Sequence, residues 1–306
     1  MKQLAMHGFS LNNYSESKSP ANIKNTIENF FHILFLASGS LSILFVLLIT
    51  FFLILSGLPA IREIGLFNFL FGKIWNAQKN TFGIFAFILT SIYGTVIATI
   101  ISFPIGIFTA IFLAKIAPPK IEIIIHKSVE LLSGIPSVIF GLVGLIVVVP
   151  FVQNFFSLSS GANLFSAIVI LQLMILPYII TISETALREV PREYEEASLA
   201  LGATKIETYF FISLRAAKSG IMSAVIQAVG RAIGEAMAII MVSGNVANMP
   251  KLFSAVRFLT TAIVSEMSYA SYGSLQRDAL FSIGFVLFFF IMLINIFLHF
   301  IKREKK

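Results

Sequence analysis

The sequence predicts an all-α, polytopic membrane protein with six transmembrane helices. Of its 306 residues, 57% are hydrophobic and only 12% are charged, whereas a soluble domain carries about 25% charged residues. Several stretches lack any charge and reach the roughly 20 residues that a helix needs to cross a bilayer. The sequence contains no cysteine, which excludes disulfides, Cys-based metal sites and a thiol nucleophile.

The predicted spans follow these charge-free stretches in chain order. The stretch 131–183 is long enough for two helices, and the small and polar residues at 157–163 predict the turn between them. Pro104, Pro136 and Pro177 are expected within spans, where neighbouring helices tolerate the kinks that proline causes. The predicted spans are residues 31–55, 84–113, two within 131–183, 219–242 and 279–301.

The basic residues predict how the chain is oriented. With six spans and a cytoplasmic N-terminus, 15 Lys and Arg residues lie inside and six outside, in agreement with the positive-inside rule. We therefore expect a multi-pass protein of the inner (cytoplasmic) membrane with both termini in the cytoplasm. Its predicted parts are an N-terminal tail at 1–30, a six-helix domain at 31–301 and a C-terminal tail at 302–306.

A polar insert at residues 184–218 separates the fourth predicted span from the fifth. Within it, Pro191 suits the first turn of a helix, and Gly202 can adopt the left-handed conformation that ends one. Thr204 and Glu207 then have the spacing of a capping box at the start of a second helix. The insert is therefore predicted to form two short amphipathic helices hinged at Gly202, a shape that fits a groove on a partner.

Five residues of the insert follow a spacing known from one family. They are Glu196, Ala197, Gly202, Ile212 and Leu214. In this respect the insert resembles the cytoplasmic coupling loop of importer-type ABC transporter permeases, which docks into the ATPase subunit. The resemblance implies an importer-type ABC permease bundle in which these five residues couple to a separate ATPase. Ser198 stands where the family has a second alanine, and Arg215 stands where it has proline, which leaves the second helix free to continue. The alternative is an ordinary surface hairpin between two spans.

Two ionisable residues lie in the middle of the fifth predicted span. Arg231 and Glu235 are four residues apart, so on a continuous helix they share a face and can pair. Charges at membrane depth are expensive and usually face the bundle interior or an aqueous path. One interpretation is a substrate pathway, in which the Arg231 guanidinium binds an oxyanion and exchanges between it and Glu235. The other is a buried ion pair that only fixes helix packing.

The residues around this pair resemble a more specific group. The runs 230–235 and 237–245 are similar to the corresponding helix of the phosphate-specific ABC permeases, in particular their PstC-type subunit, and residues 135–141 add a further match. Ala236 stands where that group usually has threonine. The resemblance implies that Arg231 and Glu235 line a path for phosphate.

These features predict a permease subunit of an ATP-driven importer of inorganic phosphate. The expected partners are an ABC ATPase, a second homologous permease, an extracytoplasmic phosphate-binding protein and membrane lipids, with no nucleic acid. No cofactor or metal is expected. The chain is not expected to be an enzyme, because the sequence contains no phosphate-binding loop of an ATPase and no catalytic cluster. The alternatives are a permease for another oxyanion, such as sulfate or molybdate, and an ATP-independent secondary transporter.

Overall fold

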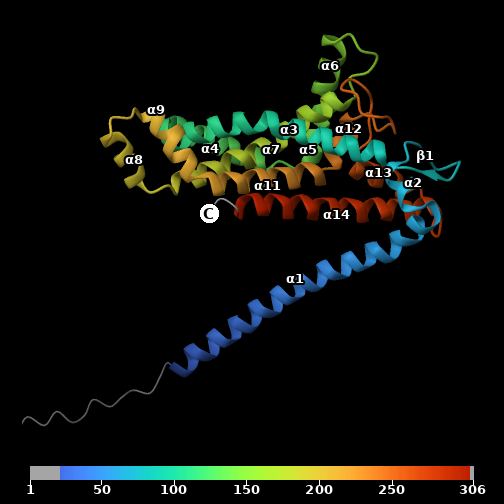
Figure 1. Cartoon of the computed structure of the whole chain (residues 1–306), viewed down its shortest axis with the longest axis horizontal. Coiled ribbons are helices and arrows are strands. Elements are labelled where there is room, and N and C mark those ends of the chain that lie inside the picture. Colours follow the sequence, from blue (N-terminus) through green and yellow to red (C-terminus); the bar gives the residue numbers. More distant parts are fainter. Residues whose placement is uncertain (1–20, 304–306) are drawn as a thin grey trace, which may run out of the picture. The chain divides into compact units, whose positions relative to one another are not determined.

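The computed structural model describes residues 21–303, which are mainly helical (Figure 1). The chain divides into two compact units, Met1–Phe52 and Leu53–Lys306. Helix α1 (Ala21–Ile64) begins in the first unit and ends in the second. It includes residues 21–30, which the sequence placed in the N-terminal tail. The remaining tail residues, 1–20 and 304–306, lie outside the described residues.

Four long helices lie side by side in the second unit (Figure 1): α3 (Phe85–Ile111), α7 (Leu164–Arg188), α11 (Lys218–Gly234) and α14 (Leu275–Arg303). Helix α7 contacts both α3 and α11, and α14 contacts α11. Glycine permits the close approach: a Cβ at Gly106 of α3 would lie 2.5 Å from the Cγ2 of Ile179 on α7. The core between these helices is fully buried and includes Ala98, Leu171, Ile175 and Ala228.

The third span begins later than the sequence predicts. Helix α4 (Pro119–Gly134) ends before Pro136, and a new helix begins with α5 (Ser137–Val143). This helix continues through the π-helical turn η2 (Gly144–Val148) into α6 (Val149–Phe155). The placement of Pro136 inside a span is therefore wrong. Proline disfavours the helical conformation of the residue before it, so Pro136 separates two helices and caps the second.

Two local predictions are confirmed, one for the turn at 157–163 and one for Pro104 and Pro177. The turn at 157–163 separates α6 from α7, and Asn163 caps α7 by accepting a hydrogen bond from the Ser166 N–H at 3.0 Å. Pro104 and Pro177 lie inside α3 and α7, as expected.

The fifth span is not the continuous helix predicted over 219–242. Helix α11 ends at Gly234, Glu235 is extended (φ −72°, ψ 128°), and the short α12 (Met237–Val242) follows. Two hydrogen bonds hold this break. The Oε1 atom of Glu235 accepts the Ala238 N–H at 3.1 Å, and its backbone carbonyl accepts the Thr260 hydroxyl at 2.6 Å. Glu235 therefore caps α12 and does not continue α11.

A bent helix precedes α11. It consists of α9 (Lys205–Glu207), the π-helical η3 (Thr208–Ser213) and α10 (Leu214–Ala216), and it meets α11 at 69°. Among the described residues, five helices are long and apolar enough to cross a membrane, and the count reaches six if the bent helix and α11 are taken together as one broken span. The fold is an all-α membrane bundle with six spans when the bent pair is included.

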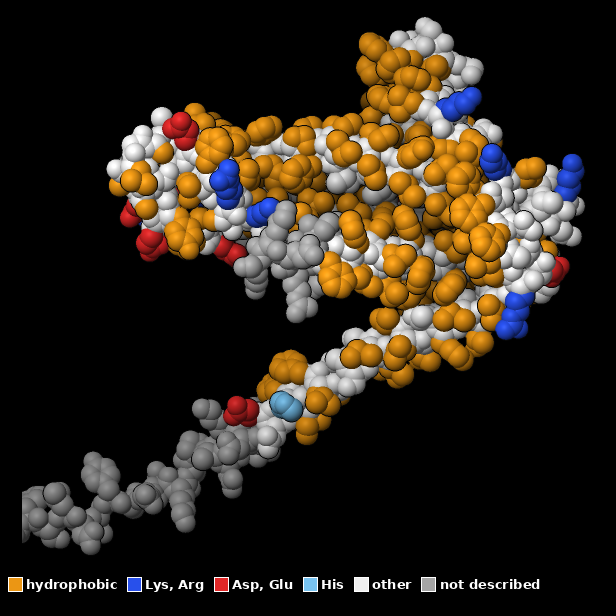
Figure 2. Space-filling view, viewed as in Figure 1, with side chains coloured by type: hydrophobic (Ala, Val, Ile, Leu, Met, Phe, Trp, Pro, Cys, Tyr) orange, Lys and Arg blue, Asp and Glu red, His pale blue; other side chains and the backbone are white. Residues whose placement is uncertain are grey.

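The two ends of the second unit differ in structure (Figure 1). One end carries α8 (Arg192–Ala200) and α9. The other carries α2 (Leu66–Phe71), a hairpin of β1 (Trp75–Asn76) with β2 (Thr81–Phe82), and α13 (Leu259–Glu266). Figure 2 shows that hydrophobic side chains cover the middle of the face in view, whereas charged side chains gather toward the two ends. This distribution is typical of a bundle that crosses a bilayer along its helices.

Candidate functional site

The predicted coupling insert at 184–218 forms two helices joined by a glycine turn. Helix α8 ends just before Gly202, whose φ of +87° is left-handed. The predicted capping box is present: Thr204 Oγ1 accepts the Glu207 N–H at 3.3 Å, and the Glu207 carboxylate accepts the Thr204 N–H at 2.8 Å. The hydrogen bond from this backbone N–H, together with one from the Thr204 hydroxyl, lowers the pKa of Glu207 because both stabilise the carboxylate.

Polar contacts tie the two helices to each other and to α3. Glu195 of α8 pairs with Lys115 at 2.6 Å and accepts the Ser213 hydroxyl at 2.8 Å. Lys115 belongs to η1 (Phe112–Ile116), which continues α3. The hydroxyls of Ser198 and Thr208 are 2.9 Å apart. Ser198, a departure from the family's alanine, therefore adds a contact between the helices. The insert is connected to the bundle as a folded unit.

The five predicted coupling residues divide between the surface and the bundle. Glu196, Ala197 and Gly202 are exposed, whereas Ile212 and Leu214 are half-buried. Leu214 packs against the core that α3 and α7 form near this end. The insert exposes five large apolar side chains, of which Leu201 is 90% exposed. These residues are Tyr194, Leu199, Leu201, Ile206 and Phe211. Large apolar side chains exposed on a polar insert are typical of a protein contact.

A charged cluster that the sequence reading missed lies at the base of the insert. Arg188, the last residue of α7, donates to Glu184 at 2.8 Å and 3.0 Å and to Glu122 of α4 at 2.7 Å. It also donates to the Leu113 carbonyl at 3.2 Å. Glu184 further contacts His126 Nδ1 at 3.2 Å. These contacts join α4, α7 and η1 where the insert begins. The spacing of four between Glu184 and Arg188 was the available sequence signal.

Arg231 lies in the last turn of α11, against a ring of α7. Its Cζ is over the Tyr178 ring, 4.7 Å from the ring centroid. Its Nε is buried and has no hydrogen-bond partner. Within residues 21–303, no carboxylate forms an ion pair with it. The ion pair with Glu235 that the spacing allows is not formed in this structure, because the helix breaks between the two residues and the Glu235 carboxylate accepts the Ala238 N–H instead.

One side of α11 is polar and open. Ser223, Gln227 and Arg231 follow one another at intervals of four residues, which places them on one side of the helix. Gln227 is exposed. A Cβ at Gly230 or Gly234 would meet nothing within 4 Å. Polar side chains on a span are costly against lipid, so this side suits a partner helix or a polar path.

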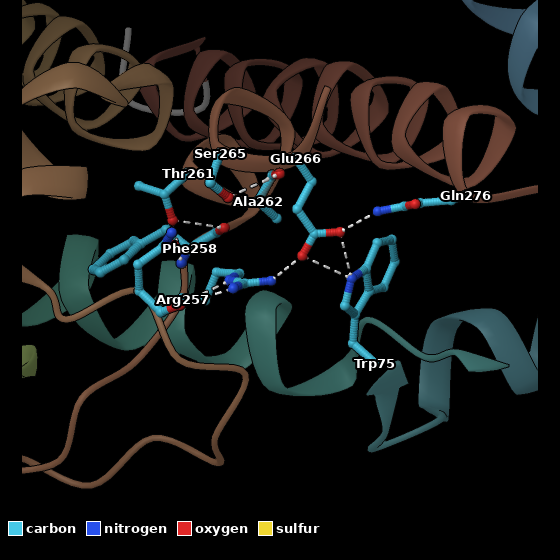
Figure 3. Close-up of polar contacts among 9 residues, drawn as sticks. Trp75, Arg257, Phe258, Thr261, Ala262, Ser265, Glu266 and Gln276 are labelled. Carbon is cyan, nitrogen blue, oxygen red and sulfur yellow. Dashed lines mark hydrogen bonds and ion pairs between the residues drawn. The ribbon is translucent and has the colours of Figure 1, made fainter. Parts of the chain in front are cut away.

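A third polar cluster lies at the end that carries the hairpin (Figure 3). The Glu266 carboxylate accepts the indole N–H of Trp75 at 2.9 Å and the Gln276 amide at 2.9 Å, and it pairs with Arg257. Arg257 also donates to the Asn245 carbonyl at 2.8 Å. Glu266 thereby joins the hairpin, α13, α14 and the loop after α12. No local pattern reveals this cluster, since Trp75 and Glu266 are 191 residues apart.

Replacing Glu266 with Gln is expected to lower the free energy of unfolding by about 2–3 kcal/mol, because it leaves the mostly buried Arg257 without its carboxylate. Denaturation in detergent, followed by the emission of Trp75, the single tryptophan, measures this loss. Gln276→Leu is the matched control. It removes only one of the contacts and is expected to cost about half as much. Equal losses in the two variants would contradict a central role for the ion pair.

Comparison with known proteins identifies relatives along most of the chain. Residues 102–303 match the family model described as binding-protein-dependent transport system inner membrane component. The probable ABC transporter permease YqgH of Bacillus subtilis is 38% identical, with 81% of this chain and 83% of the relative covered. The phosphate transport system permease PstC of Pasteurella multocida is 33% identical, with 72% and 75% covered. The probable PstC of Methanocaldococcus jannaschii is 31% identical, with 86% and 90% covered.

Solved structures match the fold. A bacterial alginate ABC transporter in complex with an alginate pentasaccharide-bound periplasmic protein aligns with a TM-score of 0.63 at 16% identity, covering 92% of this chain and 96% of that one. The inward-facing MetNI methionine ABC transporter aligns with a TM-score of 0.57 at 21% identity, covering 72% and 95%. This chain therefore shares its fold with both of these structures.

Proposed function

Because this chain belongs to the family of binding-protein-dependent transport system inner membrane components, we propose that it is the membrane-spanning permease of an ATP-driven importer and that its cargo is inorganic phosphate. Relatives that carry the name phosphate transport system permease cover most of the chain and support this cargo. The observation that carries the proposal is Arg231, a guanidinium on the open side of α11 that no carboxylate of the described residues neutralises.

An unneutralised guanidinium suits a multiply charged oxyanion. Its planar donors match two oxygens of one phosphate at once, and such charge-assisted pairs are stronger than neutral hydrogen bonds. A cation at membrane depth is costly, so a structural role alone would favour a carboxylate partner. Arg231 has instead an aromatic ring beside it and glycines along the open side. We place Arg231 in the phosphate path.

Glu235 borders the same path in this proposal. Its contacts with Ala238 and Thr260 hold the break between α11 and α12, and this break ends the helix one turn after Arg231. Its carboxylate repels an anion that approaches closely, so a phosphate is confined to the side of Arg231. The exchange of Arg231 between Glu235 and the anion requires the break to move and remains part of the proposal.

Coupling to ATP hydrolysis is assigned to the insert. The ATPase would contact the exposed Glu196, Ala197 and Gly202, together with the apolar patch around Leu201. Ile212 and Leu214 would transmit that contact to α3 and α7, against which the second helix packs. The chain itself is not an enzyme in this proposal, and a separate subunit hydrolyses ATP.

The remaining partners follow from the open surfaces. A second homologous permease would face the polar side of α11 and close the path, and an extracytoplasmic phosphate-binding protein would deliver phosphate at the end that carries the hairpin. The insert and both termini would lie in the cytoplasm, as the excess of basic residues on that side predicts. The protein would therefore be a multi-pass component of the cytoplasmic membrane.

Competition for uptake tests the cargo. In vesicles that contain the assembled importer, excess unlabelled phosphate is expected to suppress the uptake of labelled phosphate. Sulfate and molybdate at the same excess are expected to leave it unchanged. Equal suppression by sulfate or molybdate would refute phosphate as the specific cargo and favour a permease for another oxyanion.

A further inference from the structure

Tyr178 is the aromatic residue on which Arg231 rests. It lies on α7, next to Pro177, and its ring centroid is 4.7 Å from the Arg231 Cζ. Helices α7 and α11 are in direct contact over much of their length, so the two residues face each other across a packed helix pair. Within the described part of the chain, neither side chain forms a hydrogen bond or an ion pair. The contact between the Arg231 guanidinium and the Tyr178 ring joins them.

The kind of contact determines what the guanidinium can still do. A carboxylate partner would accept two of its N–H groups and neutralise its charge. An aromatic face attracts the cation through the ring quadrupole and accepts no in-plane donor. Arg231 is therefore held in place with its charge and its terminal donors available. In this state an arginine can bind one oxyanion in a bidentate manner, through two of its N–H groups.

The position of the contact also fits this role. The Nε of Arg231 is buried and has no acceptor, so no hydrogen bond from this atom fixes the orientation of the guanidinium. The side of α11 near Gly230 and Gly234 is open. Among the described residues, the ring of Tyr178 is the contact that limits where the Arg231 guanidinium points.

We propose that Tyr178 is a positioning residue for the anion-binding Arg231, acting through its ring and not through its hydroxyl. The inference rests on the proposed phosphate import. Because the ring quadrupole attracts the cation, loss of the ring is expected to weaken phosphate recognition about tenfold.

Two substitutions separate the ring from the hydroxyl. Tyr178→Leu removes the ring and is expected to raise the KM for phosphate uptake about tenfold, with the maximal rate and the phosphate-free ATPase rate of the complex close to wild type. Tyr178→Phe keeps the ring and is expected to have a KM within about twofold of wild type. Uptake is measured in vesicles with the complete importer, and co-purification of the partner subunits serves as the control for assembly.

Each outcome decides the inference. An unchanged KM in Tyr178→Leu, or an equally raised KM in Tyr178→Phe, overturns it. If Tyr178→Leu fails to assemble, Tyr178→Trp replaces it as the test. The larger ring is then expected to keep or lower the KM for phosphate uptake. A tenfold rise in that KM overturns the inference. The wild-type importer in the same vesicles tests the proposed function separately. If the wild type takes up no phosphate, phosphate import is wrong, whereas normal wild-type uptake with an unaffected Tyr178→Leu variant refutes only the role of Tyr178.

Discussion

Replacing Arg231 with Gln is expected to reduce phosphate uptake by at least about 100-fold while the permease still inserts and assembles. The substitution removes the charge and leaves at most one amide donor for the anion. Hydrogen bonds to charged groups contribute about 1.5–3 kcal/mol each, and two such bonds correspond to about a 100-fold loss or more. Uptake of labelled phosphate and co-purification with the partner subunits are measured on the same preparation.

Arg231→Lys is the matched control for this substitution. It keeps the positive charge but replaces the planar fork with a single ammonium, so an intermediate loss of uptake is expected. Loss of assembly in Arg231→Gln would instead support a structural role for the residue. The contact with Tyr178 gives this outcome a physical basis, because it joins α11 to α7.

Replacing Gly202 with Val is expected to uncouple ATP hydrolysis from transport. The left-handed φ of +87° is unfavourable for a residue with a branched Cβ by about 1–2 kcal/mol, although a Cβ there meets nothing within 4 Å. The strain would change the angle between α8 and α9 without disturbing the packing. Stimulation of ATPase activity by phosphate is expected to fall to the basal rate, and uptake should fall with it.

Gly202→Asn separates this effect from simple bulk. Asparagine tolerates the left-handed conformation, and the open surroundings of Gly202 accommodate its side chain. The variant is therefore expected to retain most of its coupling. Full stimulation by phosphate in Gly202→Val would refute the role of this turn in docking. Equal loss in both variants would point to a direct contact of the ATPase with the small surface of Gly202.

Local patterns predicted the insert well. Gly202 and the capping box of Thr204 and Glu207 involve residues close in sequence, so the backbone conformation follows from their chemistry. The substitution of Arg215 for proline likewise agrees with a helix that continues to α10. The exposed apolar patch was also present in the sequence, but an amphipathic helix does not reveal which side packs on the bundle.

Contacts between distant residues account for what the sequence did not predict. The sequence around Glu235 is mostly apolar up to Val242, so its hydropathy predicted one continuous fifth span. That prediction ran across the break that Thr260 helps to hold. Spacing alone then paired Arg231 with Glu235. The contact of Arg231 with Tyr178 depends on how α7 packs against α11, and no local pattern specifies this packing.

In the proposed mechanism, ATP hydrolysis drives phosphate uptake by this permease through the insert. The most direct measurement is phosphate accumulation in vesicles that contain the permease with its co-purified partner subunits, with and without ATP on the side of the insert. Phosphate is expected to accumulate only with ATP, and ionophores that collapse proton and sodium gradients are expected to have no effect. Accumulation driven by an ion gradient in the absence of ATP would contradict it.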